Sequence, residues 1–323
     1  MRVLAAVLAL GAALGASAQP QEARDAQRRG AELHGKGDLQ GALSEYDNVV
    51  RLAPQAPLGW YNRGLVKRDL KDCRGAIADF SRALEIERGY FNALYQRGRC
   101  RQALGDDQAA LADLTQAATL PGQVHARFMA YFARADAYRR LGRLDDAYAD
   151  YSRVLELRTD TTALRSRAWV SLYLGRLREA ANDFTRYLHQ TEGKEPDAPY
   201  AAIPAVLALR QLGARDEADK LLAHWRVRLT LKEWPAPVIE FLRGPPSEER
   251  LLAAATSAGE RTEALAYAGM AALAAGQRER GWQLLSRALR EGDPAYLEYD
   301  LAYHELRRAG RATPAERKER KPQ

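Results

Sequence analysis

The residues that most often carry catalysis or bind metals form no catalytic pattern in this chain of 323 residues. Its five histidines include no His-Glu-x-x-His arrangement, and none lies at metal-ligand spacing from a cysteine. The chain also lacks a Gly-x-Ser-x-Gly elbow and a phosphate-binding Gly-x-x-x-x-Gly-Lys-Ser/Thr loop. The carboxylate pairs at Asp106 and Asp107, and at Asp145 and Asp146, precede predicted helices, where they stabilise the helix dipole. We therefore predict a protein that is not an enzyme and that uses no cofactor and no metal.

A period of 34 residues organises the first part of the chain. Small residues recur at this interval in two series, Gly30, Gly64 and Gly98, and Ala42, Ala76 and Ala110. A larger apolar residue follows each alanine, at Tyr46, Phe80 and Leu114. This period is typical of stacked helical hairpins. The glycine lets the second helix approach the first, the alanine meets it, and the larger side chain fills the seam beside them.

On these residues the chain resembles the tetratricopeptide repeat (TPR) family, whose units carry Gly, Ala, an aromatic residue and Pro in this order. Pro54 and Pro121 close the first and third units, and the phase continues at Ala147, at Ala180 and more weakly at Ala218. The resemblance implies an all-α TPR solenoid, in which stacked hairpins form a right-handed superhelix.

Breaks in the period divide the chain into five segments. Four prolines interrupt it between 233 and 259, and the stretch 295–308 has the leucine spacing of an amphipathic helix that would cap the solenoid. We predict a cleavable signal peptide at 1–18, five TPR units at 23–190, a linker with a degenerate sixth hairpin at 191–232, a TPR-like region with a capping helix at 233–310, and a disordered basic tail at 311–323.

The C-terminal third is also similar to the new lipoprotein I family of envelope TPR proteins from Gram-negative bacteria. The resemblance lies in the run from Trp234 to Leu242, then Gly244, Ser247, Leu251, Leu252, Gly269, Glu298, Tyr299, Glu305 and Leu306. It implies a non-catalytic adaptor that brings murein hydrolases and a tail-specific protease together at the cell wall.

The N-terminus has the pattern of an export signal. Arg2 is followed by an apolar run, and Ala16-Ser17-Ala18 forms a cleavage site before Gln19. The apolar run is shorter than the ~20 residues of a spanning helix. Lipidation needs a cysteine directly after the cleavage site, and Gln19 stands there. We therefore expect a soluble periplasmic protein without a lipid anchor or a membrane span.

The formal net charge of +7 raises the question of an anionic partner. Export and the dispersed placement of the basic residues argue against nucleic acid. The excess of arginine over lysine is typical of a GC-rich coding bias, which we favour over selected anion recognition.

A solenoid of this kind would bind partners on the face formed by its first helices. Ten residues point away from the packing seam: Tyr61, Asn62, Tyr95, Arg99, Phe132, Asp136, Arg139, Arg165, Trp169 and Tyr173. Aromatic residues and arginine are enriched at interface hot spots, so we predict that this set contacts a peptide segment or protein. The alternative, packing between repeats, applies most to Phe132 and Trp169.

Cys73 and Cys100 fall where stacked TPR units bring one second helix near the next first helix. A disulfide between them would close a loop of about 28 residues and contribute roughly 3 kcal/mol in an oxidising compartment. The alternative is two separate reduced thiols.

Three functions fit this sequence. The first is a periplasmic adaptor that holds cell-wall hydrolases, a protease or its substrates. The second is a structural or assembly subunit of an envelope machine, such as a pilus or a secretion system. The third is an enzyme or a small-ligand binder. The partner and the oligomeric state stay open.

Overall fold

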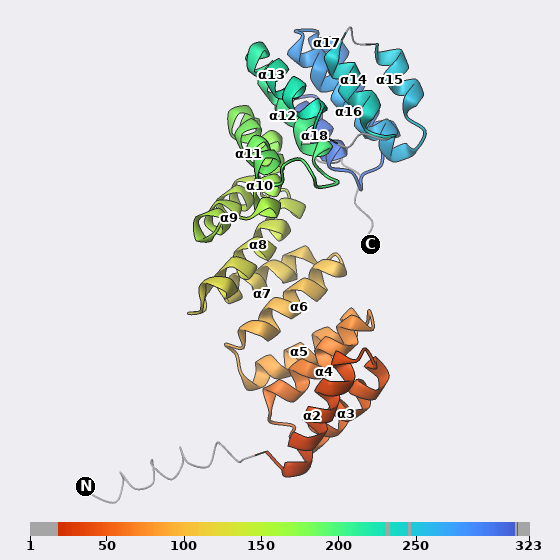
Figure 1. Cartoon of the computed structure of the whole chain (residues 1–323). Coiled ribbons are helices and arrows are strands. Elements are labelled where there is room, and N and C mark those ends of the chain that lie inside the picture. Colours follow the sequence, from red (N-terminus) through yellow and green to blue (C-terminus); the bar gives the residue numbers. More distant parts are fainter. Residues whose placement is uncertain (1–18, 230–232, 245–246, 314, 316–323) are drawn as a thin grey trace, which may run out of the picture. The chain divides into compact units, whose positions relative to one another are not determined.

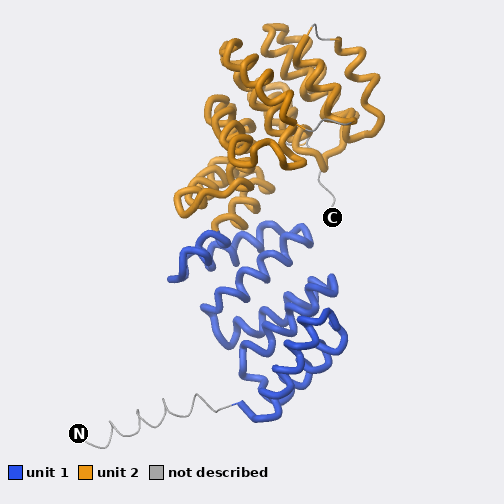
Figure 2. The backbone as a smooth tube through the Cα atoms, viewed as in Figure 1, with its two compact units in different colours: residues 1–130 blue, residues 131–323 orange. Residues whose placement is uncertain are grey.

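The structure is a computed structural model that describes residues 19–229, 233–244, 247–313 and 315. These residues form helices and turns, with no β-strand among them. The predicted signal peptide lies outside the described residues, as does most of the predicted basic tail. The chain divides into two compact units, residues 1–130 and 131–323, which we call unit 1 and unit 2 (Figure 2). The division falls inside a helix, α8 (Val124–Arg140).

Unit 1 consists of helical hairpins that follow the 34-residue period (Figure 1). In each hairpin the first helix packs against the second, and each second helix packs against the next first helix. The helices are α2 (Gln21–Gly35), α3 (Leu39–Leu52), α4 (Pro57–Asp69), α5 (Cys73–Ile86), α6 (Phe91–Ala103) and α7 (Asp107–Thr119).

The turn inside each hairpin of unit 1 uses the same local chemistry. An aspartate precedes each second helix, and its carboxylate accepts a hydrogen bond from a backbone N–H of the first turn. Asp106, for example, accepts from the Ala109 N–H at 3.1 Å, which confirms its predicted role in stabilising a helix start. The residue before this aspartate has a positive φ, 82° at Gly105 and 66° at Lys71. Glycine adopts that conformation without a steric penalty, whereas Lys71 is a strained exception.

The predicted seam between the two helices is confirmed. A Cβ atom added to Gly64 would lie 2.7 Å from Cε1 of Phe80, and one added to Gly98 would lie 2.9 Å from Cγ of Leu114. Ala76 is fully buried in α5, one turn before Phe80. The glycine therefore permits the close approach that the period predicts.

Unit 2 continues with hairpins and ends in a separate arrangement of helices (Figure 1). The second half of α8 belongs to this unit. The helices that follow are α9 (Leu144–Leu157), α10 (Thr161–Tyr173), α11 (Leu177–Gln190), α12 (Pro199–Gln211), α13 (Arg215–Arg226), α14 (Ala236–Arg243), α15 (Glu248–Ala254), α16 (Ala258–Ala274), α17 (Arg278–Glu291) and α18 (Leu297–Arg308).

The core of unit 2 is organised around helices that are buried on several sides. Most residues of α12 and α16 are buried, and the two helices pack against each other. The C-terminal helix α18 packs on α16 and α17, as a capping helix would, but it also packs on α10. None of the described helices combines the length and the apolar character that a membrane crossing requires.

Candidate functional site

The first helices of unit 1 place two predicted binding residues in the same register. Tyr61 in α4 and Tyr95 in α6 each lie three residues before the glycine of their repeat. The Tyr61 ring is half-buried, 5.8 Å from the Phe80 ring and 5.1 Å from the Tyr90 ring, and burial raises the pKa of its hydroxyl. The Tyr95 ring stacks on Phe91 with centroids 6.2 Å apart. Both tyrosines are half-exposed, so they keep surface that a partner could contact.

Two polar residues accompany these tyrosines. Asn62 is half-buried in α4, next to Tyr61. Arg99 in α6 is exposed, and its Nη1 donates to Oε1 of Gln102 at 3.5 Å, a long and weak hydrogen bond. The first-helix face of unit 1 therefore carries aromatic groups and an accessible guanidinium, as the sequence predicted. That this face binds a partner stays a prediction.

The three predicted residues of α8 lie in unit 2 and contact one another through Tyr151 of α9. The Phe132 ring meets the Tyr151 ring edge-on at 5.6 Å. Asp136 forms an ion pair with Arg139 at 2.8 Å and accepts from the Tyr151 hydroxyl at 3.5 Å. Burial and the adjacent Asp136 charge raise the pKa of Tyr151. These residues hold α8 against α9, which is the packing alternative considered for Phe132.

The predicted residues of α10 are covered to different degrees. Arg165 is half-buried and forms an ion pair with Asp197. Trp169 and Tyr173 are only 3% and 2% exposed, and the Trp169 ring meets the Phe184 ring edge-on at 5.6 Å. Their prediction as partner contacts is therefore corrected, because helices of the chain itself already cover both side chains.

The element that covers Tyr173 is the C-terminal helix α18. The Tyr173 hydroxyl donates to the carbonyl oxygen of Leu297 at 3.0 Å, and its ring stacks on His304 with centroids 5.0 Å apart. At the other end of α18, Nη1 of Arg308 donates to the carbonyl oxygens of Leu172, at 3.2 Å, and of Tyr173. The first-helix face of α10 thus holds an amphipathic helix through aromatic stacking and hydrogen bonds to backbone carbonyls.

A ladder of ion pairs within the hairpins was not predicted. In each of five hairpins, an arginine of the first helix donates two hydrogen bonds to a carboxylate sixteen residues later in the second helix. The pairs are Arg29 with Glu45, Arg63 with Asp79, Arg97 with Asp113, Arg134 with Asp150, and Arg167 with Asp183. Such two-pronged pairs fix geometry as well as adding energy.

Several of these arginines also reach the preceding hairpin. Nη1 of Arg97 donates to Oγ of Ser81 at 3.0 Å, and Nη1 of Arg167 donates to Oγ of Ser152 at 3.0 Å. The sequence held a signal for this ladder, because an arginine directly precedes the small first-helix residue of each unit, as in Arg97 before Gly98. We assign the ladder to the alignment of neighbouring hairpins and not to a ligand site.

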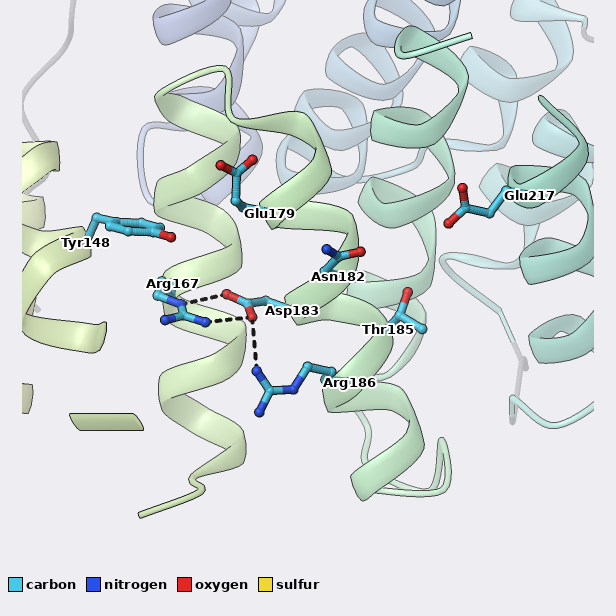
Figure 3. A pocket seen from close by; sticks show the side chains of 8 residues that line it. All are labelled: Tyr148, Arg167, Glu179, Asn182, Asp183, Thr185, Arg186 and Glu217. Carbon is cyan, nitrogen blue, oxygen red and sulfur yellow. Dashed lines mark hydrogen bonds and ion pairs between the residues drawn. The ribbon is translucent and has the colours of Figure 1, made fainter. Parts of the chain in front are cut away.

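A cavity of about 460 Å³ in unit 2 lies beside the last pair of this ladder (Figure 3). Its lining comes from α9, α10, α11 and α13, and comprises Tyr148, Arg167, Glu179, Asn182, Asp183, Thr185, Arg186 and Glu217. Arg167 and Arg186 both lie against Asp183, at 2.7 and 3.8 Å, and Glu217 pairs with Arg178 at 2.6 Å. With Glu179, which also lines the cavity, three carboxylates balance these three arginines, so we assign this cavity to the scaffold.

The two cysteines lie next to each other in unit 1, as the hairpin stacking predicted. Both are free thiols in this structure, Cys73 half-buried and Cys100 buried. Burial, followed by the contact with the Cys73 thiol, raises the pKa of Cys100 to about 12. A thiol with so high a pKa is a poor nucleophile. The disulfide itself stays a prediction.

Metal binding finds no support in the described ranges. No group of three or more His, Cys, Asp or Glu side chains there could hold a metal ion.

Comparison with known sequences finds the repeat in the middle of the chain. The profile of the tetratricopeptide repeat matches residues 128–160, which include most of α8 and the whole of α9. The chain is also similar to DnaJ homolog subfamily C member 3 of Rattus norvegicus, with 34% identity over 118 residues. That match spans 32% of this chain and 23% of the relative, so the chain covers less than a quarter of that protein's length.

Solved structures with low sequence identity share the fold. A tetratricopeptide repeat protein from Parabacteroides merdae ATCC 43184 aligns with a TM-score of 0.52 and 16% identity, over 89% of this chain and 100% of its own. MamA aligns with a TM-score of 0.50 and 22% identity, over 54% and 94%. PilW, whose structure is described as that of a type IV pilus biogenesis factor, aligns with a TM-score of 0.51 and 19% identity, over 64% and 94%. The helix order, the glycine seam and these similarities identify the fold as an all-α tetratricopeptide-repeat solenoid.

Proposed function

We propose that this protein is a non-catalytic adaptor that binds peptide segments or proteins on the first-helix faces of its hairpins. TPR folds generally serve as scaffolds for protein interaction, and the matched repeat and the shared fold support the same role here. The chemistry found on these helices, aromatic rings with a guanidinium, suits a helical or extended protein segment.

The packing of α18 on α10 is the observation that carries this proposal. Here a first-helix face holds an amphipathic helix of the chain itself, by ring stacking at Tyr173 and by hydrogen bonds to backbone carbonyls. Unit 1 presents the same side of its first helices with Tyr61 and Tyr95 half-exposed and Arg99 exposed. A helix from another protein would find accessible tyrosine rings there, as α18 finds Tyr173 in unit 2.

We further propose that the adaptor works in the periplasm. The support is the sequence of residues 1–18, whose basic start, apolar run and small-residue cleavage site are typical of a secretory signal.

The proposed partners are cell-wall hydrolases or an envelope protease, and the support is the resemblance of the C-terminal third to the new lipoprotein I family. The alternative, a subunit of a pilus or secretion assembly, draws on the likeness to PilW, which at 19% identity concerns the fold alone. Capture of several enzymes in substoichiometric amounts supports the adaptor. A single complex of fixed stoichiometry supports the assembly subunit.

A capture experiment with the mature protein tests the adaptor role. We expect the double substitution Tyr95→Ala with Arg99→Ala to abolish capture of periplasmic partners, because it removes the accessible aromatic and cationic groups of α6. Far-ultraviolet circular dichroism verifies that helicity is kept.

The matched control is Arg82→Ala with Glu85→Ala, which removes an exposed ion pair from the second helix α5 of the same unit. Capture that is undiminished by the α6 substitutions, or equally diminished by the control, contradicts the proposal.

A further inference from the structure

A second cavity in unit 2, of about 340 Å³, combines aromatic rings with carboxylates. Its walls come from the start of α12, the segment before α14, the first turns of α16 and the residue that precedes α18. The lining residues are Tyr200, Glu233, Trp234, Ser257, Glu260, Glu263 and Tyr296. Of these seven described residues, three are aromatic, three are acidic and none is basic, so they give the cavity excess negative charge.

Specific contacts hold the aromatic walls in place. Nε1 of Trp234 donates to Oε2 of Glu263 at 2.7 Å, which fixes the indole beside the carboxylate. The Tyr296 ring lies directly on Gly259 at the start of α16, where a Cβ atom would overlap the phenol. Tyr200 is half-buried, and burial followed by the charge of Glu263 raises the pKa of its hydroxyl. Glycine at 259 therefore gives the ring its position over the cavity.

Glu263 is the unusual member of this group. Its side chain is buried, with 4% of the residue exposed, and its one hydrogen bond among the described residues is the bond from Trp234. No lysine or arginine among the described residues pairs with it, although other carboxylates of unit 2 do pair, such as Glu248 with Arg280 and Glu291 with Arg261. A buried carboxylate without a cation is costly, so this position lacks the positive charge that buried carboxylates ordinarily receive.

Among the described residues, the groups that face Glu263 add negative charge and supply no positive charge. Glu260 faces it from the preceding turn of α16 and Glu298 from α18, and Glu298 is itself buried and accepts from the Tyr267 hydroxyl at 2.5 Å. The phenols that face Glu263 are those of Tyr200, Tyr267 and Tyr296. Burial, and then the charge of Glu298, raises the pKa of Glu263 to about 8.

The positive end of the α16 helix dipole does not compensate Glu263. Oε2 of Glu260 already accepts from the backbone N–H groups of Thr256 and Ser257, at 2.7 and 2.9 Å, in a capping box with Ser257. The side-chain bonds at the start of α16 therefore involve Glu260 and Ser257, and none of these backbone N–H groups donates to Glu263.

We propose that this cavity binds an organic cation, namely the guanidinium or alkylammonium group of a basic side chain from a partner protein. Aromatic faces attract such cations, and a carboxylate that is poor in solvent strengthens the attraction. The cavity volume lies in the range of small-ligand sites. Metal ions fit less well, because the described carboxylates do not converge as a metal set. The choice of a protein as the source of the cation rests on the proposed adaptor function, whereas cation binding itself does not.

Isothermal titration calorimetry with blocked amino acids tests this site on the full mature chain. The probes are N-acetyl-arginine amide and N-acetyl-lysine amide, with uncharged N-acetyl-citrulline amide as the matched neutral probe. We expect the cationic probes to bind at least tenfold more tightly than the neutral one. Binding should release close to one proton near pH 7, because the cation favours ionised Glu263. Below pH 8, the affinity should therefore increase by up to about tenfold for each unit by which the pH is raised.

Two substitutions distinguish binding in this cavity from binding to other acidic parts of the surface. Glu263→Gln keeps an acceptor for Trp234 and should weaken cation binding at least tenfold and end the proton release. Glu249→Gln changes an exposed carboxylate outside the cavity and should leave binding unchanged. Tetramethylammonium serves as the probe for a small free quaternary cation, and binding of it alone contradicts a side-chain ligand. The proposal is overturned if the cationic probes bind no more tightly than the neutral probe, or if Glu263→Gln and Glu249→Gln weaken binding equally. Because these probes involve no partner, failure of protein capture and failure of this site are distinguishable.

Discussion

The ion-pair ladder predicts that Asp113 contributes far more to stability than a chemically identical residue in the same network. Asp113 is 3% exposed and accepts three hydrogen bonds, two from Arg97 at 2.9 and 2.7 Å and one from Arg101 at 2.7 Å. Hydrogen bonds to charged groups contribute about 1.5–3 kcal/mol each. The guanidinium groups of Arg97 and Arg101 are 17% and 23% exposed, so water can partly solvate them once Asp113→Ala removes their partner. We therefore expect a loss of about 2–4 kcal/mol.

The matched control is Asp47→Ala. Asp47 is 58% exposed and accepts one hydrogen bond from Arg63 at 2.8 Å, so its removal should cost no more than about 1 kcal/mol. Native-state hydrogen exchange followed by mass spectrometry measures both variants. Opening of α6 and α7 should become about 30- to 1,000-fold more frequent in Asp113→Ala, with a much smaller change in α2 and α3, because repeats couple mainly to their neighbours. Equal effects of the two substitutions would refute the assignment of the ladder to hairpin alignment.

Three further predictions concern the seam, the C-terminal helix and the buried carboxylate. Gly64→Ala should cost about 1–3 kcal/mol in chemical denaturation, because its Cβ would lie 2.7 Å from Phe80, and an unchanged midpoint would contradict the close approach. Tyr173→Phe keeps the ring but removes the hydrogen bond to Leu297, so limited proteolysis of α18 should accelerate about fivefold, as expected for a loss of about 1 kcal/mol. The pKa of Glu263 is raised from 4.5 to about 8 in the folded state, so the unfolded chain loses this proton at a lower pH than the folded chain does. The stability of unit 2 should therefore fall as the pH rises between those two values. Glu263→Gln should flatten that part of the thermal stability profile, and an unchanged profile would mean that this carboxyl does not titrate there.

The repeat architecture could be predicted from sequence because its contacts are local and periodic. Gly64 and Phe80 lie in one hairpin, so the spacing that predicts the helices also predicts their seam, and the structure confirms it. The Arg97 and Asp113 pair is equally local and carries the same period, but the pairing was not predicted.

The covered face of α10 could not be predicted in this way. The leucine spacing of α18 indicates an amphipathic helix but does not say which surface it contacts. Its hydrogen bond from Tyr173 to Leu297 spans 124 residues and follows no repeat. Likewise, the cavity around Glu263 is formed by segments that meet only in the folded unit, so no local sequence motif predicts it.

The central claim is that first-helix faces bind protein segments, and a hydrogen-exchange footprint of a captured partner tests it most directly. The exchange of backbone amides is compared for the mature protein alone and in the purified complex. We expect slower exchange in α4 and α6, around Tyr61 and Tyr95, with little change on the second helices α5 and α7. Protection confined to α5 and α7 would contradict the claim.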